Sequence, residues 1–219
     1  MYQLEILPRE NHETARQYAF RILRHNILYL KLPPGELISE TELSQQLSMS
    51  RTPIREALKD LEKSHIVQIE PQRGTFVADI DQKLVSDACF LRLIIERAVV
   101  NLACKGISPD YINKLEENLF VSSYYVTRGE IYKWFAEDDA FHYLLYQACG
   151  KGEIYKLFDD LMIHFNRIRI MNLKEENMII AHKEHISLLE AIKNCDDDQA
   201  QKILEQHLTY CVSHCNDNI

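Results

Sequence analysis

Apolar residues near the start of the chain are spaced for two short helices. They recur every three or four positions over residues 12–31, which predicts a helix, and the Pro-Pro-Gly sequence at 33–35 ends it. Ser39 stands three residues before Glu42, a capping box that predicts a second helix as far as residue 47.

A third predicted helix follows after a tight turn and has two distinct faces. We expect Thr52 as its N-cap and Pro53 as its first residue, where the missing N–H costs nothing. Arg51, Arg55 and Lys59 lie four residues apart on one face. The other face is apolar and is expected in the core: Ile54, Ala57, Leu58 and Leu61.

Two short helices joined by a tight turn predict a helix-turn-helix. In such a motif the N-terminal residues of the second helix reach base edges, and arginine commonly binds guanine through two hydrogen bonds. Arg51 and Arg55 would then read bases and Lys59 would contact phosphate. The alternative is a surface helix with solvated arginines. The next segments favour DNA binding, because residues 66–70 and 75–78 alternate like two strands around a turn at 71–74.

Helices followed by a β-hairpin are the order of a winged helix, and Arg73 beside Gly74 would form its basic tip. From residue 84 onward the pattern is helical throughout. Apolar residues at helical spacing predict an antiparallel bundle of about six helices, over 84–105, 109–127, 130–149, 153–172, 175–194 and 197–215. The expected fold is therefore mainly α, with a winged helix over 1–78, a linker over 79–86 and a helical domain over 87–219.

Charge and composition agree with two units of different function. Of the 219 residues, the first 78 carry no net charge, whereas the remainder carries the whole net charge of −8. No apolar run approaches the ~20 residues of a membrane span, and the N-terminus does not resemble a signal peptide, so we expect a cytoplasmic protein without a membrane partner. The six cysteines contain no C-x-x-C pair and are expected as reduced thiols.

The helical half contains a candidate metal site. Asp138 and His142 are four residues apart, so both project from one face of a helix. His185 and His207 each lie 11 residues from Asp196, the centre of the predicted turn between the last two helices. In an antiparallel pair they therefore stand at the same level.

Three imidazoles and one carboxylate suit Zn²⁺, Ni²⁺, Mn²⁺ or Fe²⁺ and are unsuited to Ca²⁺. The alternative for these histidines is a set of ordinary core residues. Arg92 could pair with an organic acid in a cavity, or form a structural pair with Glu96 on its own helix.

The sequence S-R-T-P-I-R-E-A-L at 50–58, followed by Arg-Gly at 73–74, resembles the DNA-binding domain of the GntR family of bacterial transcription regulators. The resemblance implies operator contacts by six residues: Ser50, Arg51, Thr52, Arg55, Arg73 and Gly74. Members often have a basic residue where this chain has Thr41, so its operator preference could differ.

Residues 86–213 resemble the FCD effector domain of the FadR subfamily. Its D-x-x-F-H pattern is met by Asp138, Phe141 and His142, its E-H pattern by Glu184 and His185, and its final histidine by His207. In metal-binding members these positions hold the ion, and a carboxylate effector completes its coordination. Many members have a Gly-Asn pair where this chain has Gly150 and Lys151. The difference is expected to affect only the local loop geometry.

We therefore expect a homodimeric regulator, not an enzyme, that binds an operator in double-stranded DNA and responds to a small organic acid bound at the metal and at Arg92. One alternative is a regulator for which the metal itself is the signal. A metalloenzyme is the other alternative, and it is disfavoured because no general base can be identified by spacing near the site.

Overall fold

The computed structural model describes residues 2–216, except for the side chains of 159, 160 and 210–216. The chain divides into two compact units, with the boundary after Leu84. Each unit is described by itself. Within the described residues, no helix is both long and apolar enough to cross a membrane.

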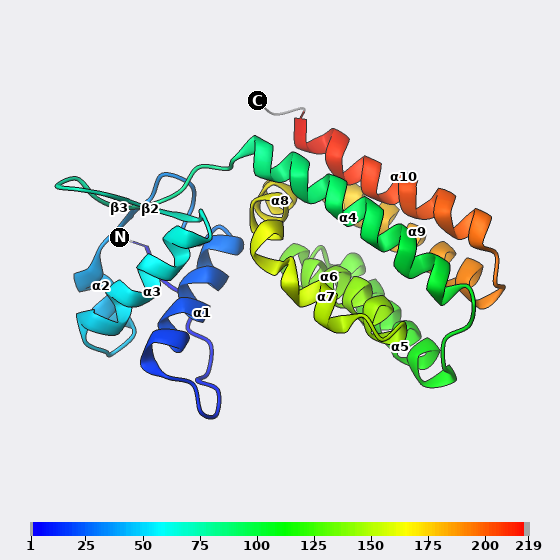
Figure 1. The fold of residues 1–219 in the computed structure, drawn as a ribbon, viewed down its shortest axis with the longest axis horizontal. Helices are drawn as coiled ribbons and strands as arrows, with labels where there is room; N and C mark the ends of the chain where they lie inside the picture. Colours follow the sequence, from blue (N-terminus) through cyan, green and yellow to red (C-terminus); the bar gives the residue numbers. More distant parts are fainter. Residues whose placement is uncertain (1, 217–219) are drawn as a thin grey trace. The chain divides into compact units, whose positions relative to one another are not determined.

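The first unit is a winged helix, as predicted (Figure 1). Its elements are α1 (Ala15–Leu28), β1 (Leu37–Ile38), α2 (Glu40–Gln46), α3 (Arg51–Lys63), β2 (Val67–Glu70) and β3 (Gly74–Val77). The strands form an antiparallel sheet in the order β1-β3-β2, with Gln68 opposite Phe76. Strand β1 was not predicted, because a two-residue strand has too few positions to show alternation.

The start of α3 differs from the prediction. The helix begins at Arg51 with Ser50 at the N-cap, so Thr52 is not the cap and Pro53 is the third helical residue. The first four N–H groups of a helix have no partner within the helix. Proline is therefore tolerated throughout this turn, and its position alone does not fix the cap. At α2 the Ser39 hydroxyl accepts a hydrogen bond from the Glu42 N–H at 3.3 Å, which is one half of the predicted capping box. The other half is absent, because the Ser39 N–H donates to the Tyr2 hydroxyl.

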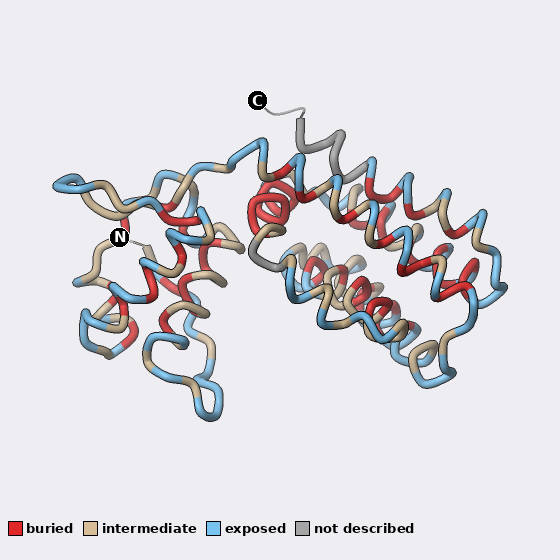
Figure 2. The backbone as a smooth tube through the Cα atoms, viewed as in Figure 1, coloured by how far each residue is buried: buried red, intermediate tan, exposed pale blue. Residues whose placement is uncertain are grey.

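Helices α1 and α3 form the core of the first unit. Their facing sides are buried in Figure 2, with Ile22, Leu23 and Ile27 from α1 and Ile54 and Leu58 from α3 almost fully shielded from water. On the surface the Arg16 guanidinium donates to both carboxylate oxygens of Asp60, at 2.6 and 2.7 Å, which ties α1 to α3. This core leaves the opposite face of α3 open to solvent.

The second unit is a bundle of seven helices over the described residues, rather than about six. They are α4 (Gln82–Ala103), α5 (Pro109–Arg128), α6 (Ile131–Ala148), α7 (Gly152–Leu157), α8 (Asp159–Asn172), α9 (Glu175–Lys193) and α10 (Asp197–Asn216). The helix predicted over 153–172 is interrupted at Phe158, where no glycine or proline marks the break. Helix α4 begins at Gln82, inside the stretch predicted as a linker.

Helices α9 and α10 form the predicted antiparallel hairpin (Figure 1). The Asp196 carboxylate accepts a hydrogen bond from the Gln199 N–H at 3.0 Å and so caps α10. Buried residues from α5, α6, α9 and α10 share one hydrophobic core, which includes Leu115, Phe141, Leu188 and Leu204. This core fixes the histidine-bearing helices relative to one another.

The four cysteines with described side chains, at 89, 104, 149 and 195, are free thiols. The side chains of Cys211 and Cys215 lie outside the described residues.

Candidate functional site

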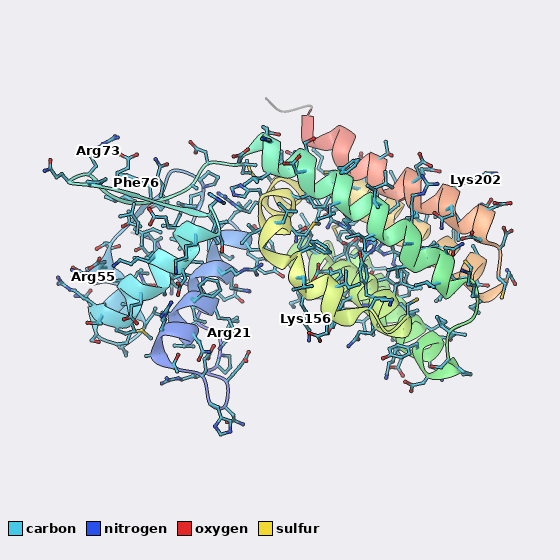
Figure 3. All side chains as sticks on the ribbon, viewed as in Figure 1. Arg21, Arg55, Arg73, Phe76, Lys156 and Lys202 are labelled. Atoms are coloured by element: carbon cyan, nitrogen blue, oxygen red, sulfur yellow. The ribbon has the colours of Figure 1, made fainter. Side chains whose placement is uncertain are left out.

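The N-terminal end of α3 presents its polar face to solvent. Arg51, Thr52 and Arg55 are exposed, and the Ser50 hydroxyl makes no capping hydrogen bond that would occupy it. Figure 3 shows Arg55 and Arg73 extending outward from the first unit. The hydrophobic face of α3 determines this orientation, since its buried residues hold the other side of the helix in the core.

Arg55 is exposed but not unpaired. Its Nε lies 2.8 and 2.7 Å from the two carboxylate oxygens of Glu40, at the start of α2. The Arg55 side chain keeps 60% of its accessible surface. The Arg51 side chain makes no hydrogen bond or ion pair with any residue that the structure describes. The two candidate base-reading arginines therefore differ, because Glu40 restrains only Arg55.

The wing tip is formed by Arg73 and Gly74. Arg73 is exposed and forms an ion pair with Glu70 across the turn. Gly74 has φ +134°, and a Cβ on it would lie 2.8 Å from Cδ1 of Leu37. The backbone conformation therefore favours glycine at this position, whereas the exposed end of the Leu37 side chain could move away from a Cβ.

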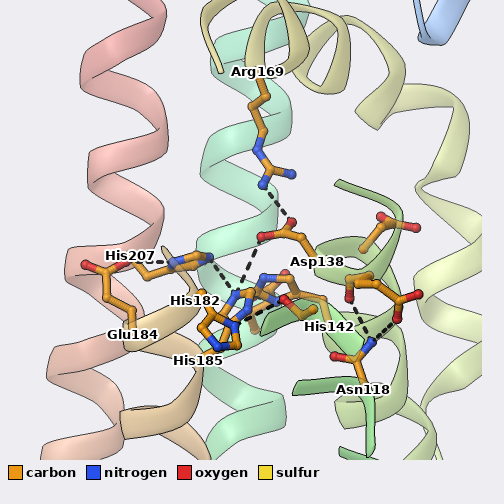
Figure 4. A network of polar contacts seen from close by, with 12 residues as sticks. Asn118, Asp138, His142, Arg169, His182, Glu184, His185 and His207 are labelled. Carbon is orange, nitrogen blue, oxygen red and sulfur yellow. Dashed lines mark hydrogen bonds and ion pairs between the residues drawn. The ribbon is translucent and has the colours of Figure 1, made fainter. Parts of the chain in front are cut away.

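In the second unit the structure brings together the four predicted metal ligands (Figure 4). Asp138 and His142 come from α6, His185 from α9 and His207 from α10, and each is at most 1% exposed. The atoms that they offer as ligands all lie within 4.8 Å of one another. Equal spacing from Asp196 has indeed placed the two hairpin histidines level, with their Nε2 atoms 3.2 Å apart.

Three of the four cluster residues lie close to a charged side chain outside the cluster. The Glu184 carboxylate lies 2.8 Å from Nδ1 of His207, and Oε2 of Glu96 lies 2.9 Å from Nδ1 of His142. The Arg169 guanidinium donates to Oδ2 of Asp138 at 2.7 Å. The contact with Glu184 is a hydrogen bond and favours the His207 tautomer with its proton on Nδ1, which leaves Nε2 as the ligand atom. Oε2 of Glu96 and Nδ1 of His142 are close but do not form a hydrogen bond.

Burial governs the protonation of the cluster. It lowers the pKa of His185 to about 3 and that of His207 to about 4, and it holds the pKa of His142 well below its ordinary value. Burial alone would raise the pKa of Asp138, but Arg169 and the histidines outweigh it, so the pKa is lowered. The imidazoles are therefore neutral and the carboxylate is ionised, which are the forms that bind a metal.

The donor set fits a divalent transition metal. Oδ1 of Asp138 and Nε2 of His142 are buried without any hydrogen-bond partner among the described residues, which is costly unless something else binds them. Oδ1 of Asp138 also lies 3.7 Å from Nε2 of His185. Ligand atoms held by one ion at about 2.1 Å are roughly 3 to 4 Å apart, so these separations suit a shared ion.

A pocket lies beside the cluster, and Arg92 and Glu96 of α4 form part of its wall. Its volume is about 450 Å³ when the solvent-filled mouth is included. None of the four cluster residues lines it. The Arg92 Nε donates to Oε1 of Glu96 at 2.6 Å, so the structural pair is present and the same arginine also faces the pocket.

Sequence spacing identified Glu96 as a partner of Arg92 but not as a neighbour of His142, and it identified neither Glu40 nor Glu184 as a partner at these sites. Glu40 reaches Arg55 from another helix, and Glu96 likewise reaches His142, so no local spacing marks these contacts. Glu184 directly precedes His185 and therefore points away from it, toward His207 across the hairpin. The E-H pattern, in which Glu184 stands next to His185, was the one sequence signal that could have pointed to Glu184.

Comparisons with known proteins agree with this architecture. Residues 15–77 match the family described as "Bacterial regulatory proteins, gntR family", and residues 87–210 match the FCD domain. The HTH-type transcriptional repressor RspR of Escherichia coli (strain K12) is 31% identical over 199 residues, which cover 90% of this chain and 86% of that protein.

Two solved structures share the fold. The structure titled E. coli McbR/YncC superposes with a TM-score of 0.79 at 18% identity, covering 92% of this chain and 97% of that one. A GntR regulator from Rhodococcus sp. RHA1, described as putative in its title, gives 0.78 at 19% identity, covering 93% and 98%. The two domain matches and the full-length relative together show that this chain belongs to the GntR family of bacterial transcriptional regulators and carries an FCD domain.

Proposed function

We propose that this regulator is a homodimeric repressor whose operator binding responds to a small carboxylate bound at a divalent-metal centre in the FCD domain. The observation that carries the proposal is the buried cluster of Asp138, His142, His185 and His207, with its unsatisfied ligand atoms. A repressor role is supported by the name of the E. coli relative.

DNA binding is assigned to the exposed end of α3 and to the wing. Arg51 and Arg55 would contact base edges in the major groove, with Ser50 and Thr52 on adjacent phosphates. Arg73 and Gly74 would approach the minor groove or the backbone. Two copies of the unit in a dimer would read an inverted repeat.

The cluster would hold Zn²⁺, Ni²⁺, Mn²⁺ or Fe²⁺ through three imidazoles and one carboxylate. When bound, the ion would supply a positive centre for an organic acid. Burial would keep the histidines neutral, and Glu184 would orient His207 through the hydrogen bond at its Nδ1.

The pocket beside the cluster supports a small hydroxylated acid as effector. Arg92 provides a guanidinium for its carboxylate. Asp139 supplies an acceptor for hydroxyl groups, as does Asn166, whose Oδ1 is buried and unpartnered among the described residues. The rings of Tyr146 and Tyr155 would contact the carbon chain.

The test combines DNA binding with metal analysis. Purified protein is expected to contain one transition-metal ion per chain by elemental analysis, to be a dimer in native mass spectrometry, and to retard a fragment from its own promoter region. His185→Ala should lose the metal and the response to a panel of small hydroxy acids while keeping operator recognition. Arg55→Ala should keep the metal and weaken operator binding by about tenfold to a hundredfold.

Two results would contradict this division. One is that no upstream fragment is retarded even at low salt, and the other is that both variants lose the same properties. If metal-loaded protein differs from apo protein in DNA affinity without any acid, the metal itself is the signal.

A further inference from the structure

Residues 2–8 form an irregular segment, here called the N-terminal strap, that is hydrogen-bonded to two helices of the winged helix. At α1 the Asn26 carboxamide accepts a hydrogen bond from the Glu5 N–H at 2.7 Å and donates one to the Glu5 carbonyl at 3.0 Å. The Tyr18 hydroxyl donates to the Leu7 carbonyl at 3.1 Å. Asn26 is completely buried, so the strap satisfies polar atoms that water does not reach. The strap is therefore an integral part of this unit.

The strap also contacts both ends of α2. At the carboxyl end, the Gln46 carboxamide donates to the Tyr2 carbonyl at 3.1 Å and accepts from the Leu4 N–H at 2.9 Å. At the amino end, the Tyr2 hydroxyl accepts a hydrogen bond from the Ser39 N–H at 3.1 Å. Tyr2 therefore binds one end of the helix through its backbone and the other end through its side chain.

The Tyr2 hydroxyl replaces the missing half of the capping box of α2. In a complete box the Glu42 side chain would accept the hydrogen bond of the Ser39 N–H. Tyr2 accepts it instead, from a position 37 residues away along the chain. The first turn of α2 is therefore restrained by a contact with the strap as well as by its own cap.

This first turn carries the carboxylate that restrains Arg55. Glu40 directly follows Ser39 and is the first residue of α2, and its two carboxylate oxygens lie 2.8 and 2.7 Å from Nε of Arg55. The contact uses Nε, so the two terminal nitrogens of the guanidinium remain available for a guanine edge. A chain of direct contacts and one peptide bond thus joins Tyr2 to Arg55.

We propose that Tyr2 is a positioning residue for operator recognition, which acts through Glu40 on the side chain of Arg55. This inference rests on the base contact assigned to Arg55 above. The Tyr2 hydrogen bond fixes the first turn of α2, and that turn places the Glu40 carboxylate against the guanidinium. Without the hydrogen bond, Arg55 samples more orientations and discriminates less well between bases, since two hydrogen bonds to one base require a fixed direction.

A double-mutant cycle on sequence discrimination tests the proposal in the full-length protein. Fluorescence anisotropy measures the affinity for a duplex from the chain's own promoter region and for a random-sequence duplex, with wild type, Tyr2→Phe, Glu40→Ala and the double variant. Tyr2→Phe removes only the hydroxyl and should lower the ratio of the two affinities by about two- to fivefold, within the net contribution of one hydrogen bond. In the Glu40→Ala background the same change should alter the ratio by less than about 1.5-fold, because the link to Arg55 is already absent.

Tyr18→Phe is the matched control. It also removes a phenolic hydroxyl that bonds the strap, but at α1, and it leaves the contacts with α2 in place. Its ratio of affinities should equal that of the wild type. Thermal melts of both variants show whether a loss of discrimination is only a loss of stability, because the two substitutions should lower the melting temperature by similar amounts.

A second measurement needs no DNA. Nitrogen-15 relaxation of the Arg55 Nε–H group reports how far the guanidinium is restrained in the free protein. Tyr2→Phe and Glu40→Ala should both increase its fast motion, whereas Tyr18→Phe should not. This measurement separates failure of the restraint from failure of the assigned DNA contact.

Three results overturn the proposal. An additive cycle, or unchanged Arg55 motion in Tyr2→Phe, removes Tyr2 from recognition while leaving the base contact of Arg55 intact. A Tyr18→Phe variant that loses as much discrimination as Tyr2→Phe shows that only the stability of the strap matters. Operator binding that is unaffected by Arg55→Ala overturns both the assigned base contact and the role of Tyr2.

Discussion

The arginines at the candidate sites of the two units differ in their burial. In the winged helix Arg51, Arg55 and Arg73 are exposed, and their acidic partners, where present, lie at the surface. In the bundle Arg92 and Arg169 are buried, and each is bound to a buried carboxylate. A DNA-reading charge must be accessible to a large partner, whereas a charge at a ligand centre acts most strongly away from water.

This difference has an energetic consequence. An exposed ion pair is screened by water and contributes little to stability, but breaking a buried pair leaves one charge without solvent or partner. Substitutions in the bundle should therefore alter stability as well as binding. Substitutions of the exposed arginines should alter binding alone.

The largest expected effect comes from Asp138→Ala. Arg169 would remain buried without its carboxylate, so the free energy of unfolding should fall by about 3–5 kcal/mol. The single tryptophan, Trp134, is buried in α6, and its fluorescence during urea unfolding reports on the bundle. Arg16→Ala breaks the exposed pair with Asp60 and serves as the surface comparison. The contrast between the units fails if the two variants are equally stable.

Gly74→Ala tests whether the wing depends on its backbone. The substitution forces an alanine into φ +134°, which should cost about 1–3 kcal/mol in the winged helix. Circular dichroism during thermal unfolding measures the loss, and the operator affinity should fall with it. Gly35 has φ +78°, nearer the left-handed helical region that other residues can adopt, so Gly35→Ala should have a milder effect. Equal effects would show that the more extreme φ of Gly74 carries no extra strain.

Glu40→Gln sharpens the comparison within the winged helix. It leaves the charge of Arg55 but removes the carboxylate that restrains the guanidinium. We expect the ratio of operator to random-sequence affinity to fall a few-fold, because a less ordered arginine discriminates bases less well. Fluorescence anisotropy with two DNA duplexes measures this ratio. Glu56→Gln, which removes an exposed carboxylate that does not pair with Arg55, is the control. An unchanged ratio would remove Glu40 from operator recognition.

The last comparison concerns pH and the buried thiol of Cys104. Burial raises the pKa of this thiol to about 11. In the unfolded chain a cysteine ionises near pH 8.5, so the unfolded state loses its proton first and stability falls as pH rises from about 8.5 to 11. Urea unfolding at pH 8 and pH 10.5 should show a larger loss for the wild type than for Cys104→Ala. A parallel loss in both proteins would exclude a contribution from Cys104.

Local patterns predicted most of the elements and the clustering of the four candidate metal ligands. The proximity of Asp138 and His142 was predicted from the spacing within one helix. The proximity of His185 and His207 was predicted from equal distances along one hairpin. Each prediction therefore required only one or two correctly placed helices. The cap of α2 at Ser39 was likewise a local hydrogen bond. The N-cap of α3 was misplaced because proline fits several positions in a first helical turn.

What the sequence could not predict depends on contacts between distant segments. Glu96 reaches His142 from α4, and Arg169 reaches Asp138 from α8, so their roles depend on how whole helices pack. The break at Phe158 has no glycine or proline to mark it. The roles of Glu40 and Glu184 are set by the same kind of contact, across a turn or across a hairpin.

The Glu40–Arg55 pair also has a consequence for the ionic-strength dependence of binding. Each phosphate neutralised by a free cationic side chain releases counterions and adds about 0.9 to the slope of log affinity against log salt. Arg55 is already paired with Glu40, so its binding to DNA should release fewer counterions. The side chains of Arg51 and Lys59 have no acidic partner among the described residues. A rise in salt concentration should therefore lower the affinity for random-sequence DNA more steeply than the contribution of Arg55 to operator affinity.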